Sequence, residues 1–230
     1  MSRMRRTPPE PSEIARIETW VFDLDNTLYH PSAHDLFPAM DERMNAFIAD
    51  LLDCDVEAAN RYRRQWFERH GTTLRGLIEE HGVEPAAFLE FVHDLDLSGL
   101  ALNARLDRAL AALPGRKVIF TNATETHAVR VTERLGIRHH FEAVFDVVAA
   151  DYLPKPNARA YARFMERHGI APASAAMFED TARNLEPARQ LGMTTVWVET
   201  ERPNARPAPD ADYIDFGTDD LVGWLEAVAR

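Results

Sequence analysis

The chain has 230 residues, 46% of them hydrophobic, and a formal net charge of −11. This apolar content excludes a disordered chain, and the length allows one large domain or a core with a smaller insert. The acidic balance argues against a surface that coats nucleic acid, and it means that an anionic substrate needs a site that reverses the sign of the charge locally.

Cysteine usage and hydropathy indicate where the protein acts. The sequence contains one cysteine, Cys54, which excludes an internal disulfide and favours a reducing compartment. No apolar run approaches the ~20 residues that a membrane-spanning helix needs. The segment 1–11 is basic but lacks the apolar stretch of a secretory signal. We therefore expect a cytoplasmic protein without a nucleic-acid or membrane partner, either a monomer or a homodimer.

Two aspartates follow the first predicted strand of the chain. The apolar run 20–22 (Trp-Val-Phe) is typical of a buried strand, and Asp23 and Asp25 come directly after it. Residues two apart on an extended backbone point to the same side, so these two carboxylates repel one another. A divalent hard cation, which binds carboxylate and backbone oxygens together, is the simplest way to offset that repulsion.

Three interpretations compete for the motif formed by Asp23, Asp25 and Thr27. It can be a loop whose polar side chains hydrogen-bond their own backbone and start a helix. An EF-hand calcium loop is rejected, because it needs Gly at its sixth position and Glu at its twelfth, where this chain has Leu28 and His34. The third interpretation is a nucleophilic aspartate beside an acid/base aspartate, and the rest of the chain must decide.

A helical module is predicted between residues 30 and 100, after the first strand. Apolar residues recur at three- and four-residue spacing over 36–52, which indicates an amphipathic helix. A helix is also predicted over 56–70, a short one follows a cap over 71–74 and runs to 81–82, and a further one begins at Pro85. No strand pattern interrupts these helices, so the module is predicted to be entirely helical.

Strands and helices alternate regularly from residue 101 onwards. Repeated β-α units of this length predict an α/β fold with a doubly wound parallel sheet and right-handed crossovers. With residues 15–29 this part forms a Rossmann-like core, which follows a loose tail over 1–14. Thr218 is predicted to cap the last helix. The predicted strands are 117–120, 143–148, 175–178, 194–198 and an edge strand over 213–216, and the predicted helices are 103–113, 125–135, 157–168, 181–191 and a last one that carries Leu221 and Trp224.

Four predicted strand ends carry groups that can react or bind charge. Parallel strands place their carboxyl ends on one edge of a sheet, so these groups are expected to converge. Each has a structural explanation in isolation, such as a turn residue or a solvated loop lysine, but their joint order favours a function. The groups are Asp23 with Asp25, Thr121 with Asn122, Lys155 between two prolines, and Glu179 with Asp180.

These motifs resemble those of the haloacid dehalogenase-like superfamily of phosphatases over about residues 19–199. The resemblance rests on the run 23–27 (Asp-Leu-Asp-Asn-Thr), Thr121, Lys155 and the Glu179-Asp180 pair, in that order. The helical module resembles the C1 cap of that family. Within the superfamily, the chain resembles the pyrimidine 5′-nucleotidase branch. This resemblance rests on Leu28-Tyr29, the run 71–77 (Gly-Thr-Thr-Leu-Arg-Gly-Leu) and the run 91–96 (Phe-Val-His-Asp-Leu-Asp).

The resemblance implies a phosphatase that forms an aspartyl-phosphate. Asp23 would attack phosphorus as an ionised carboxylate. Asp25, with a pKa raised by the neighbouring carboxylate, would protonate the leaving oxygen and later take a proton from water. Lys155 would offset the charge of the reacting groups, and Thr121 and Asn122 would hydrogen-bond the phosphoryl oxygens.

The same resemblance implies a magnesium site. Mg²⁺ would be held by Asp23, Asp180 and the backbone carbonyl of Asp25, with Glu179 orienting a water molecule of the ion. A dehalogenase is disfavoured, because that branch of the family lacks the second aspartate.

The substrate implied by the resemblance is a small phosphorylated metabolite, most specifically a nucleoside monophosphate such as UMP or CMP. Alternatives are a sugar-phosphate phosphatase, a phosphomutase resembling β-phosphoglucomutase, and a fold that binds nucleotide or a partner without turnover. Asn184 either reaches the site or faces solvent. His139 and His140 are not expected to form a metal pair, because adjacent side chains diverge. The candidates for contacts to the leaving group are Thr72, Thr73, Arg75, His93 and Asp96.

Overall fold

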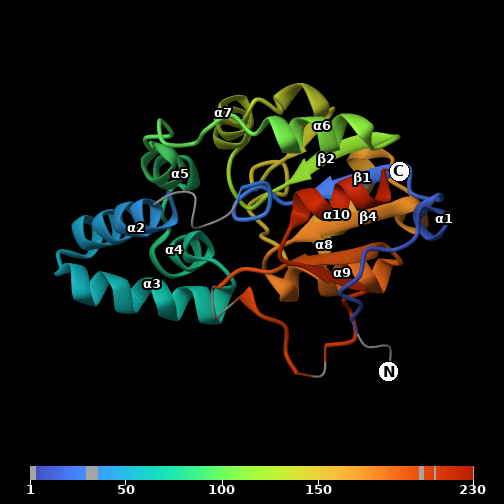
Figure 1. The fold of residues 1–230 in the computed structure, drawn as a ribbon. Helices are drawn as coiled ribbons and strands as arrows, with labels where there is room; N and C mark the ends of the chain where they lie inside the picture. Colours follow the sequence, from blue (N-terminus) through green and yellow to red (C-terminus); the bar gives the residue numbers. More distant parts are fainter. Residues whose placement is uncertain (1–3, 30–35, 202–204, 210, 230) are drawn as a thin grey trace.

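A six-stranded parallel sheet forms the centre of the molecule (Figure 1). The structure is a computed structural model, and it describes residues 4–29, 36–201, 205–209 and 211–229. The strand order is β3-β2-β1-β4-β5-β6 with every neighbouring pair parallel, which confirms the predicted α/β sheet. The strands are β1 Thr19–Phe22, β2 Arg116–Phe120, β3 Ala143–Phe145, β4 Ala175–Glu179, β5 Thr194–Val198 and β6 Phe216–Thr218.

Helices cover both faces of this sheet. Side chains alternate along a strand, so Trp20 and Phe22 of β1 pack on one face and Val21 on the other. Helices α1, α6, α7 and α10 cover the face of Phe22, and α8 and α9 cover the face of Val21 (Figure 1). The bounds are α1 Pro11–Ile14, α6 Ala104–Ala112, α7 Glu125–Leu135, α8 Ala158–His168, α9 Leu185–Leu191 and α10 Leu221–Val228, with 3₁₀ turns η2 Arg138–His140, η3 Pro172–Ser174 and η4 Ala182–Asn184.

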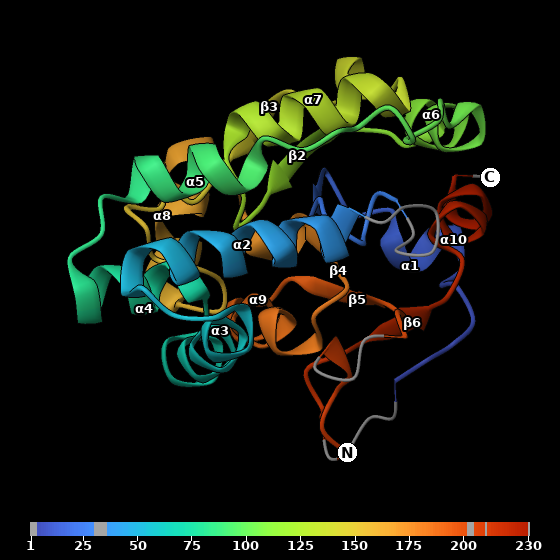
Figure 2. The same cartoon turned by 90° about the vertical axis from the view of Figure 1, so that its left-hand side faces the viewer.

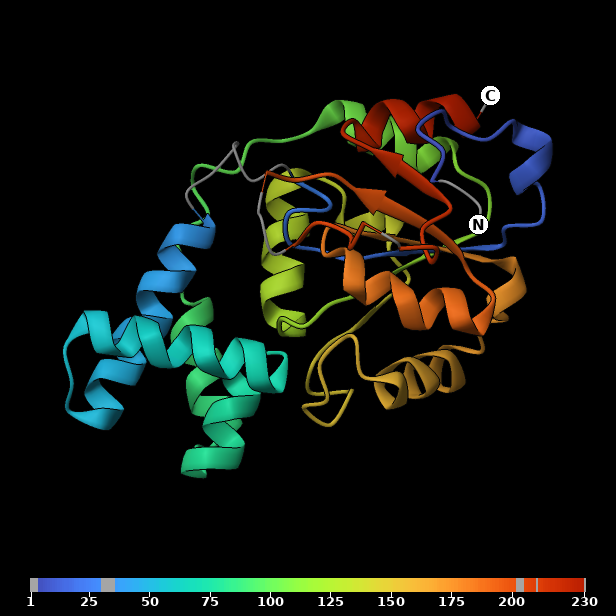
Figure 3. The ribbon, with the colours of Figure 1, turned by 90° about the horizontal axis from the view of Figure 1, so that it is seen from below.

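Four helices between β1 and β2 form a separate module, which we call the cap. The cap has its own apolar cluster, which includes Trp66, Leu77 and Phe88. It lies at one end of the molecule, beside the sheet (Figures 1 and 3), and Figure 2 views the molecule from that side. The predicted start of the module at residue 30 lies outside the described residues. The helices are α2 Leu36–Leu52, α3 Val56–His70, α4 Thr73–His81 and α5 Pro85–His93.

The last strand differs from the prediction. β6 begins at Phe216, the last residue of the predicted edge strand, so Thr218 lies within the strand and does not cap the last helix. Asp220 caps α10 instead, because its side chain accepts a hydrogen bond from the Gly223 N–H at 2.9 Å. Arg5 pairs with this strand in parallel, and its carbonyl accepts from the Gly217 N–H at 2.9 Å.

The N-terminal segment packs on the core where the structure describes it, so the prediction of a loose tail over 1–14 is wrong for residues 4–14. The Arg5 bridge to β6 and the buried Ile14 of α1 fix this segment. The predicted helix over 181–191 is a 3₁₀ turn followed by α9, and β3 is only three residues long. Among the described helices, none is both long and apolar enough to cross a membrane.

Candidate active site

The carboxyl ends of the strands and the cap enclose a cavity of about 690 Å³. Every reactive group that the sequence predicted at a strand end lines this cavity, as parallel pairing of β1, β2 and β4 requires. The volume lies within the range typical of small-molecule sites. The core residues that line the cavity include Asp23, Asp25, Thr121, Asn122, Lys155, Glu179, Asp180 and Asn184.

Lys155 is the buried cation at the centre of this site. Its ammonium lies 2.7 Å from Asp23 Oδ1, 2.7 Å from Glu179 Oε2 and 2.7 Å from the Phe120 carbonyl oxygen, and the residue is 1% exposed. Burial acts to lower the pKa of Lys155, but the carboxylates of Asp23 and Glu179 outweigh it and raise the pKa. The lysine therefore stays charged and balances part of the negative charge.

Three buried carboxylates converge around this single ammonium. Oxygens of Asp23, Glu179 and Asp180 lie within 4.8 Å of one another. Burial, followed by repulsion from Glu179, raises the pKa of Asp23 to about 7. Burial raises the pKa of Glu179 to about 7 as well, against the lowering by Lys155. This corrects the expectation that Asp23 is fully ionised at neutral pH, which holds only if further positive charge is added.

This oxygen-rich cluster has the chemistry of a site for Mg²⁺. Hard divalent cations prefer carboxylate oxygens, and Asp23, Glu179 and Asp180 each offer one within 4.8 Å of the others. A cation among these groups would favour their ionised forms and lower the raised pKa values of Asp23 and Glu179.

Thr27 connects the ends of two neighbouring strands. Its hydroxyl donates to Asp23 Oδ2 at 3.0 Å and accepts from the Asp180 N–H at 3.1 Å. The Asp23 N–H in turn donates to the Phe178 carbonyl at 2.9 Å. The threonine of the motif thus fixes the nucleophile candidate against the strand that carries the acidic pair, a role that the spacing in the sequence could not reveal.

Asp25 is held by two side chains whose contact with it was not predicted from the sequence. Its Oδ1 accepts from the Tyr29 hydroxyl at 2.6 Å and lies 3.0 Å from His127 Nε2. Burial acts to raise the pKa of Asp25, but the contacts with His127 and Tyr29 outweigh it and lower the pKa. The expected raised pKa is therefore wrong for this state of the protein. His127 was missed because it lies 102 residues away in the chain.

The groups that follow β2 have different environments. Thr121 is buried, and its hydroxyl accepts a hydrogen bond from the Ala123 N–H at 3.0 Å. The side-chain Oδ1 of Asn122 accepts a hydrogen bond from the Lys155 N–H at 2.8 Å, and its Nδ2 donates one to the Lys155 carbonyl at 3.3 Å. Asn122 therefore fixes the loop that carries Lys155, a contact that was not predicted. Its role in binding substrate stays a prediction.

The cap candidates divide into two groups. Thr72, Thr73 and His93 line the cavity, although Thr72 also caps α4 by accepting from the Arg75 N–H at 3.1 Å. Arg75 and Asp96 are not among the lining residues. Arg75 pairs with Glu79 in its own helix, and Asp96 accepts from the N–H and hydroxyl of Ser98.

Asn184 reaches the cavity rather than solvent. The residue is 6% exposed and lines the cavity from η4. Within the described part of the chain, its side-chain Oδ1 has no hydrogen-bond partner. A buried polar atom without a partner costs free energy, which a bound ligand that donates a hydrogen bond would recover.

A family of hydrolases matches most of this chain. The family model of haloacid dehalogenase-like hydrolases matches residues 17–192. Phosphate metabolism protein 8 of Saccharomyces cerevisiae is 25% identical, over 80% of this chain and 62% of its own length. The phosphoglycolate phosphatase of Chromobacterium violaceum is 36% identical, over 39% of this chain and 40% of its own length. The match thus covers less than two thirds of either relative.

Solved structures share the fold at low sequence identity. A HAD phosphatase from Thermococcus onnurineus has a TM-score of 0.59 and 17% identity, covering 88% of this chain and 93% of its own. An L-2-haloacid dehalogenase from Xanthobacter autotrophicus has a TM-score of 0.58 and 17% identity, covering 92% of this chain and 98% of its own. These likenesses establish the fold alone, because both phosphatases and dehalogenases adopt it.

Proposed function

Because the chain belongs to the haloacid dehalogenase-like hydrolases, we propose that it is a magnesium-dependent phosphomonoesterase that acts through an aspartyl-phosphate. The observation that carries this proposal is the buried cluster in which the Lys155 ammonium lies 2.7 Å from both Asp23 and Glu179, beside Asp180. A nucleophilic carboxylate, a buried ammonium and further oxygen ligands are the parts that transfer of a phosphoryl dianion requires.

The reaction follows from the placement of the two aspartates of the motif. A carboxylate oxygen of Asp23 attacks phosphorus, the bond to the leaving oxygen breaks, and that oxygen takes a proton from Asp25. Water then attacks the aspartyl-phosphate while Asp25 accepts its proton, which releases inorganic phosphate and restores Asp23. Asp25 lines the same cavity as Asp23, so both groups can reach one substrate.

The acidic cluster would hold the metal ion in this mechanism. We assign Asp23, Asp180 and the backbone carbonyl of Asp25 as its ligands, with Glu179 supporting them. When bound, Mg²⁺ offsets the repulsion between the Asp23 carboxylate and the phosphate dianion. Lys155 holds Asp23 in place, and its positive charge offsets the same repulsion without the metal ion.

The size and lining of the cavity support a nucleoside monophosphate as the substrate. The cavity volume of about 690 Å³ exceeds what a two-carbon phosphate ester needs. Phe67 and Phe88 of the cap give the cavity an apolar side. Asn184 offers an unpartnered carbonyl oxygen, and Thr72 and Thr73 offer hydroxyls, so polar groups of a leaving nucleoside have partners. The resemblance of the cap motifs to those of the pyrimidine 5′-nucleotidase branch supports this choice of substrate. The expected location is the cytoplasm.

Phosphate release from a substrate panel tests this proposal. The panel contains nucleoside monophosphates, sugar phosphates and phosphoglycolate, each assayed with Mg²⁺ and with EDTA. We expect UMP or CMP to be preferred, and activity to require Mg²⁺ and to be lost in Asp23→Asn. The matched control is Asp50→Asn, since Asp50 lies exposed on α2.

Other outcomes of the panel would contradict the proposal at different levels. Equal turnover of all esters would reduce it to a general small-molecule phosphatase. Formation of sugar bisphosphate without free phosphate would indicate a phosphomutase. Halide release from a 2-haloacid, or undiminished activity of the Asp23→Asn variant, would remove the phosphatase mechanism.

A further inference from the structure

Asp25 is contacted by two side chains that do not line the substrate cavity. Asp25 lines the cavity, whereas Tyr29 and His127, which both contact its Oδ1, are not among the lining residues. Burial and the Asp25 carboxylate raise the pKa of Tyr29 well above its usual value, so the tyrosine keeps its proton and donates. Both contacts use Oδ1, so neither of them occupies the second carboxylate oxygen, Oδ2.

The imidazole of His127 has few other polar contacts to fix it. It is 1% exposed, and its Nδ1 has no hydrogen-bond partner within the described residues. Its ring stacks on that of His93, with the centroids 4.7 Å apart and the planes 25° from parallel. The contact to Asp25 on one side and the stack with His93 on the other therefore set the orientation of His127.

His93 belongs to the cap, whereas His127 belongs to the core. His93 ends α5, and its Nδ1 lies 3.3 Å from the hydroxyl of Thr124, which also accepts from the His127 N–H as the N-cap of α7. Arg130 of α7 donates to the carbonyls of His93 and Leu95, at 3.0 and 2.8 Å. The end of the cap helix is thus joined to the helix that carries His127.

We propose that His127 is a positioning residue for the general acid Asp25, and that stacking by His93 makes this positioning depend on the seating of the cap. This inference rests on the proposed phosphatase function. With Oδ1 fixed by Tyr29 and His127, Oδ2 is directed towards the leaving oxygen when the cap is in place. Displacement of the cap removes the His93 ring that stacks on His127, so that Asp25 is no longer held in one orientation.

A comparison of leaving groups separates this role from a merely structural one. A nucleoside monophosphate leaves as a basic alkoxide that needs a proton from Asp25, whereas p-nitrophenyl phosphate leaves as a stable phenolate that does not. His127→Phe keeps a ring for the stack but removes the hydrogen bond. We expect it to lower kcat/KM on the nucleotide by roughly 10- to 100-fold and to leave kcat/KM on the aryl ester nearly unchanged, because this ratio covers the steps up to departure of the leaving group and not the later hydrolysis, in which Asp25 acts for both esters.

Three further variants sharpen the test. His127→Gln retains a donor on a side chain of similar reach, so it should recover part of the rate on the nucleotide. His93→Ala removes the stack and should reproduce the selective loss, whereas His93→Phe should reproduce it only weakly. Thermal unfolding and the rate on the aryl ester report whether each variant is folded.

The outcomes distinguish this inference from the proposed function itself. If wild-type protein releases no phosphate from either ester with Mg²⁺, the proposed function fails and the role of His127 fails with it. If wild type is active and His127→Phe loses kcat/KM equally on both esters, or loses none, the positioning role alone is overturned.

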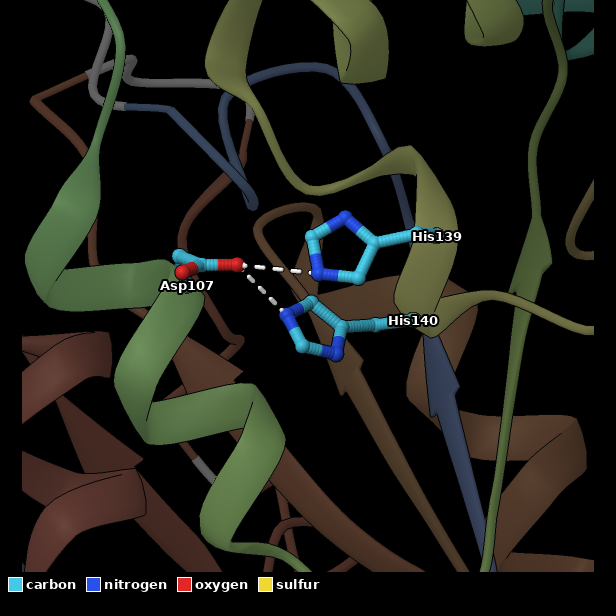
Figure 4. Close-up of side chains that lie close together, drawn as sticks. All are labelled: Asp107, His139 and His140. Carbon is cyan, nitrogen blue, oxygen red and sulfur yellow. Dashed lines mark hydrogen bonds and ion pairs between the residues drawn. The ribbon is translucent and has the colours of Figure 1, made fainter.

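A second, independent inference concerns a cluster on the other side of the fold. His139 and His140 of η2 both face Asp107 in the first turn of α6 (Figure 4). Asp107 Oδ1 lies 2.7 Å from His140 Nε2 and 3.2 Å from His139 Nε2, and the two rings are 4.0 Å apart. The expectation that the adjacent histidines diverge is therefore wrong, because the tight 3₁₀ turn brings both rings to one carboxylate.

The donor atoms of this cluster suit a transition metal. Two imidazole nitrogens and one carboxylate oxygen lie within 4.8 Å of one another, a set that favours zinc-like cations over Mg²⁺. The His140 side chain is 11% exposed and the His139 side chain 66%, so one ligand is fixed in the protein and the open side admits water. We propose that Asp107, His139 and His140 bind a divalent cation of the zinc class.

Titration of the full chain with Zn²⁺ in excess Mg²⁺ tests this site, since Mg²⁺ occupies the oxygen-rich cluster. We expect one zinc site per chain by calorimetry, with affinity reduced at least ~10-fold in His140→Ala and in Asp107→Asn. The control is His70→Ala, because His70 contacts Glu79 and Glu80 without a second imidazole. Wild-type affinity in His140→Ala, or an equal loss in the control, would overturn the assignment.

Discussion

At the scale of single residues, Lys155 determines the charge balance of the site. The ammonium is buried between Asp23 and Glu179, and its removal leaves carboxylates without compensation. Breaking a buried pair in this way costs more free energy than losing hydrogen bonds to neutral groups.

We therefore expect Lys155→Met to lower the free energy of unfolding by about 3–5 kcal/mol, measured by urea unfolding at neutral pH in EDTA. The matched control is Lys117→Met. Lys117 is also buried, but among the described residues its ammonium donates only to the carbonyls of Leu113 and Gly115, so its loss should cost about 1–3 kcal/mol. Equal losses in the two variants would show that charge compensation is not what Lys155 supplies.

Two elements of the cap meet closely at Gly76 in α4. A Cβ atom added at this glycine would lie 2.4 Å from Cβ of Trp66 in α3, and the glycine thus lets the two helices pack. Helix propensity alone predicts that alanine stabilises such a position by up to ~1 kcal/mol. Overpacking against a buried tryptophan outweighs that gain, at about 1–3 kcal/mol.

We expect Gly76→Ala to lower the midpoint of thermal unfolding by a few degrees, roughly 2–4 °C per kcal/mol for a chain of this size. The sign is the informative part, because a raised midpoint would mean that Trp66 does not hold the position described. The proposed activity on nucleoside monophosphates should fall in the variant as well, since α4 begins with Thr73 in the cavity wall.

The contact between α5 and the core predicts a pH dependence of stability. Burial, followed by the neighbouring His127, lowers the pKa of His93 to about 3, against an ordinary value of about 6.5. Between these values the unfolded chain binds a proton that the folded protein does not. The free energy of unfolding therefore falls as the pH is lowered from 6.5 towards 3.

We expect His93→Phe to lose this contribution, which amounts to at most ~1.4 kcal/mol per pH unit. Urea unfolding of wild type and variant at pH 7 and pH 5 measures it, because the other titrating groups are common to both proteins. Identical losses of stability on acidification would show that His93 is not held neutral against His127.

The elements that could be predicted from the sequence are those with local patterns. The apolar run before Asp23 and the spacing of apolar residues in α2 are properties of adjacent residues, so both elements were located correctly. β6 was misplaced because its position depends on pairing with β5 and on a bridge to Arg5, which lies more than two hundred residues away in the chain. Thr218 was consequently assigned to a helix cap.

The candidate site divides in the same way. Asp23, Thr121, Lys155 and Asp180 stand at the ends of recognisable strands, and the parallel sheet brings them together. The contact of His127 with Asp25 joins distant elements, and that of Tyr29 depends on the fold of the loop after β1, so neither could be read from the sequence. The lowered pKa of Asp25 depends on those contacts, so the predicted direction of its shift was wrong.

On the scale of the whole molecule, the net charge is −11, and three of the acidic residues meet in the buried cluster of Asp23, Glu179 and Asp180. A ligand that binds only the folded state stabilises it by mass action, by about 2.7 kcal/mol at a hundred times its dissociation constant. We expect Mg²⁺ to raise the unfolding temperature of wild type and to do so less in Asp180→Asn. An equal rise in both proteins would place the effective cation elsewhere.

The most direct test of the central claim is chemical trapping of the phosphoryl group. Enzyme that is turning over a nucleoside monophosphate with Mg²⁺ is quenched in acid and treated with borohydride, which reduces an acyl phosphate to an alcohol. Peptide mass spectrometry should then recover Asp23 as homoserine, and only when substrate and Mg²⁺ were both present. Turnover with residue 23 unmodified, or reduction at another carboxylate, would contradict the mechanism.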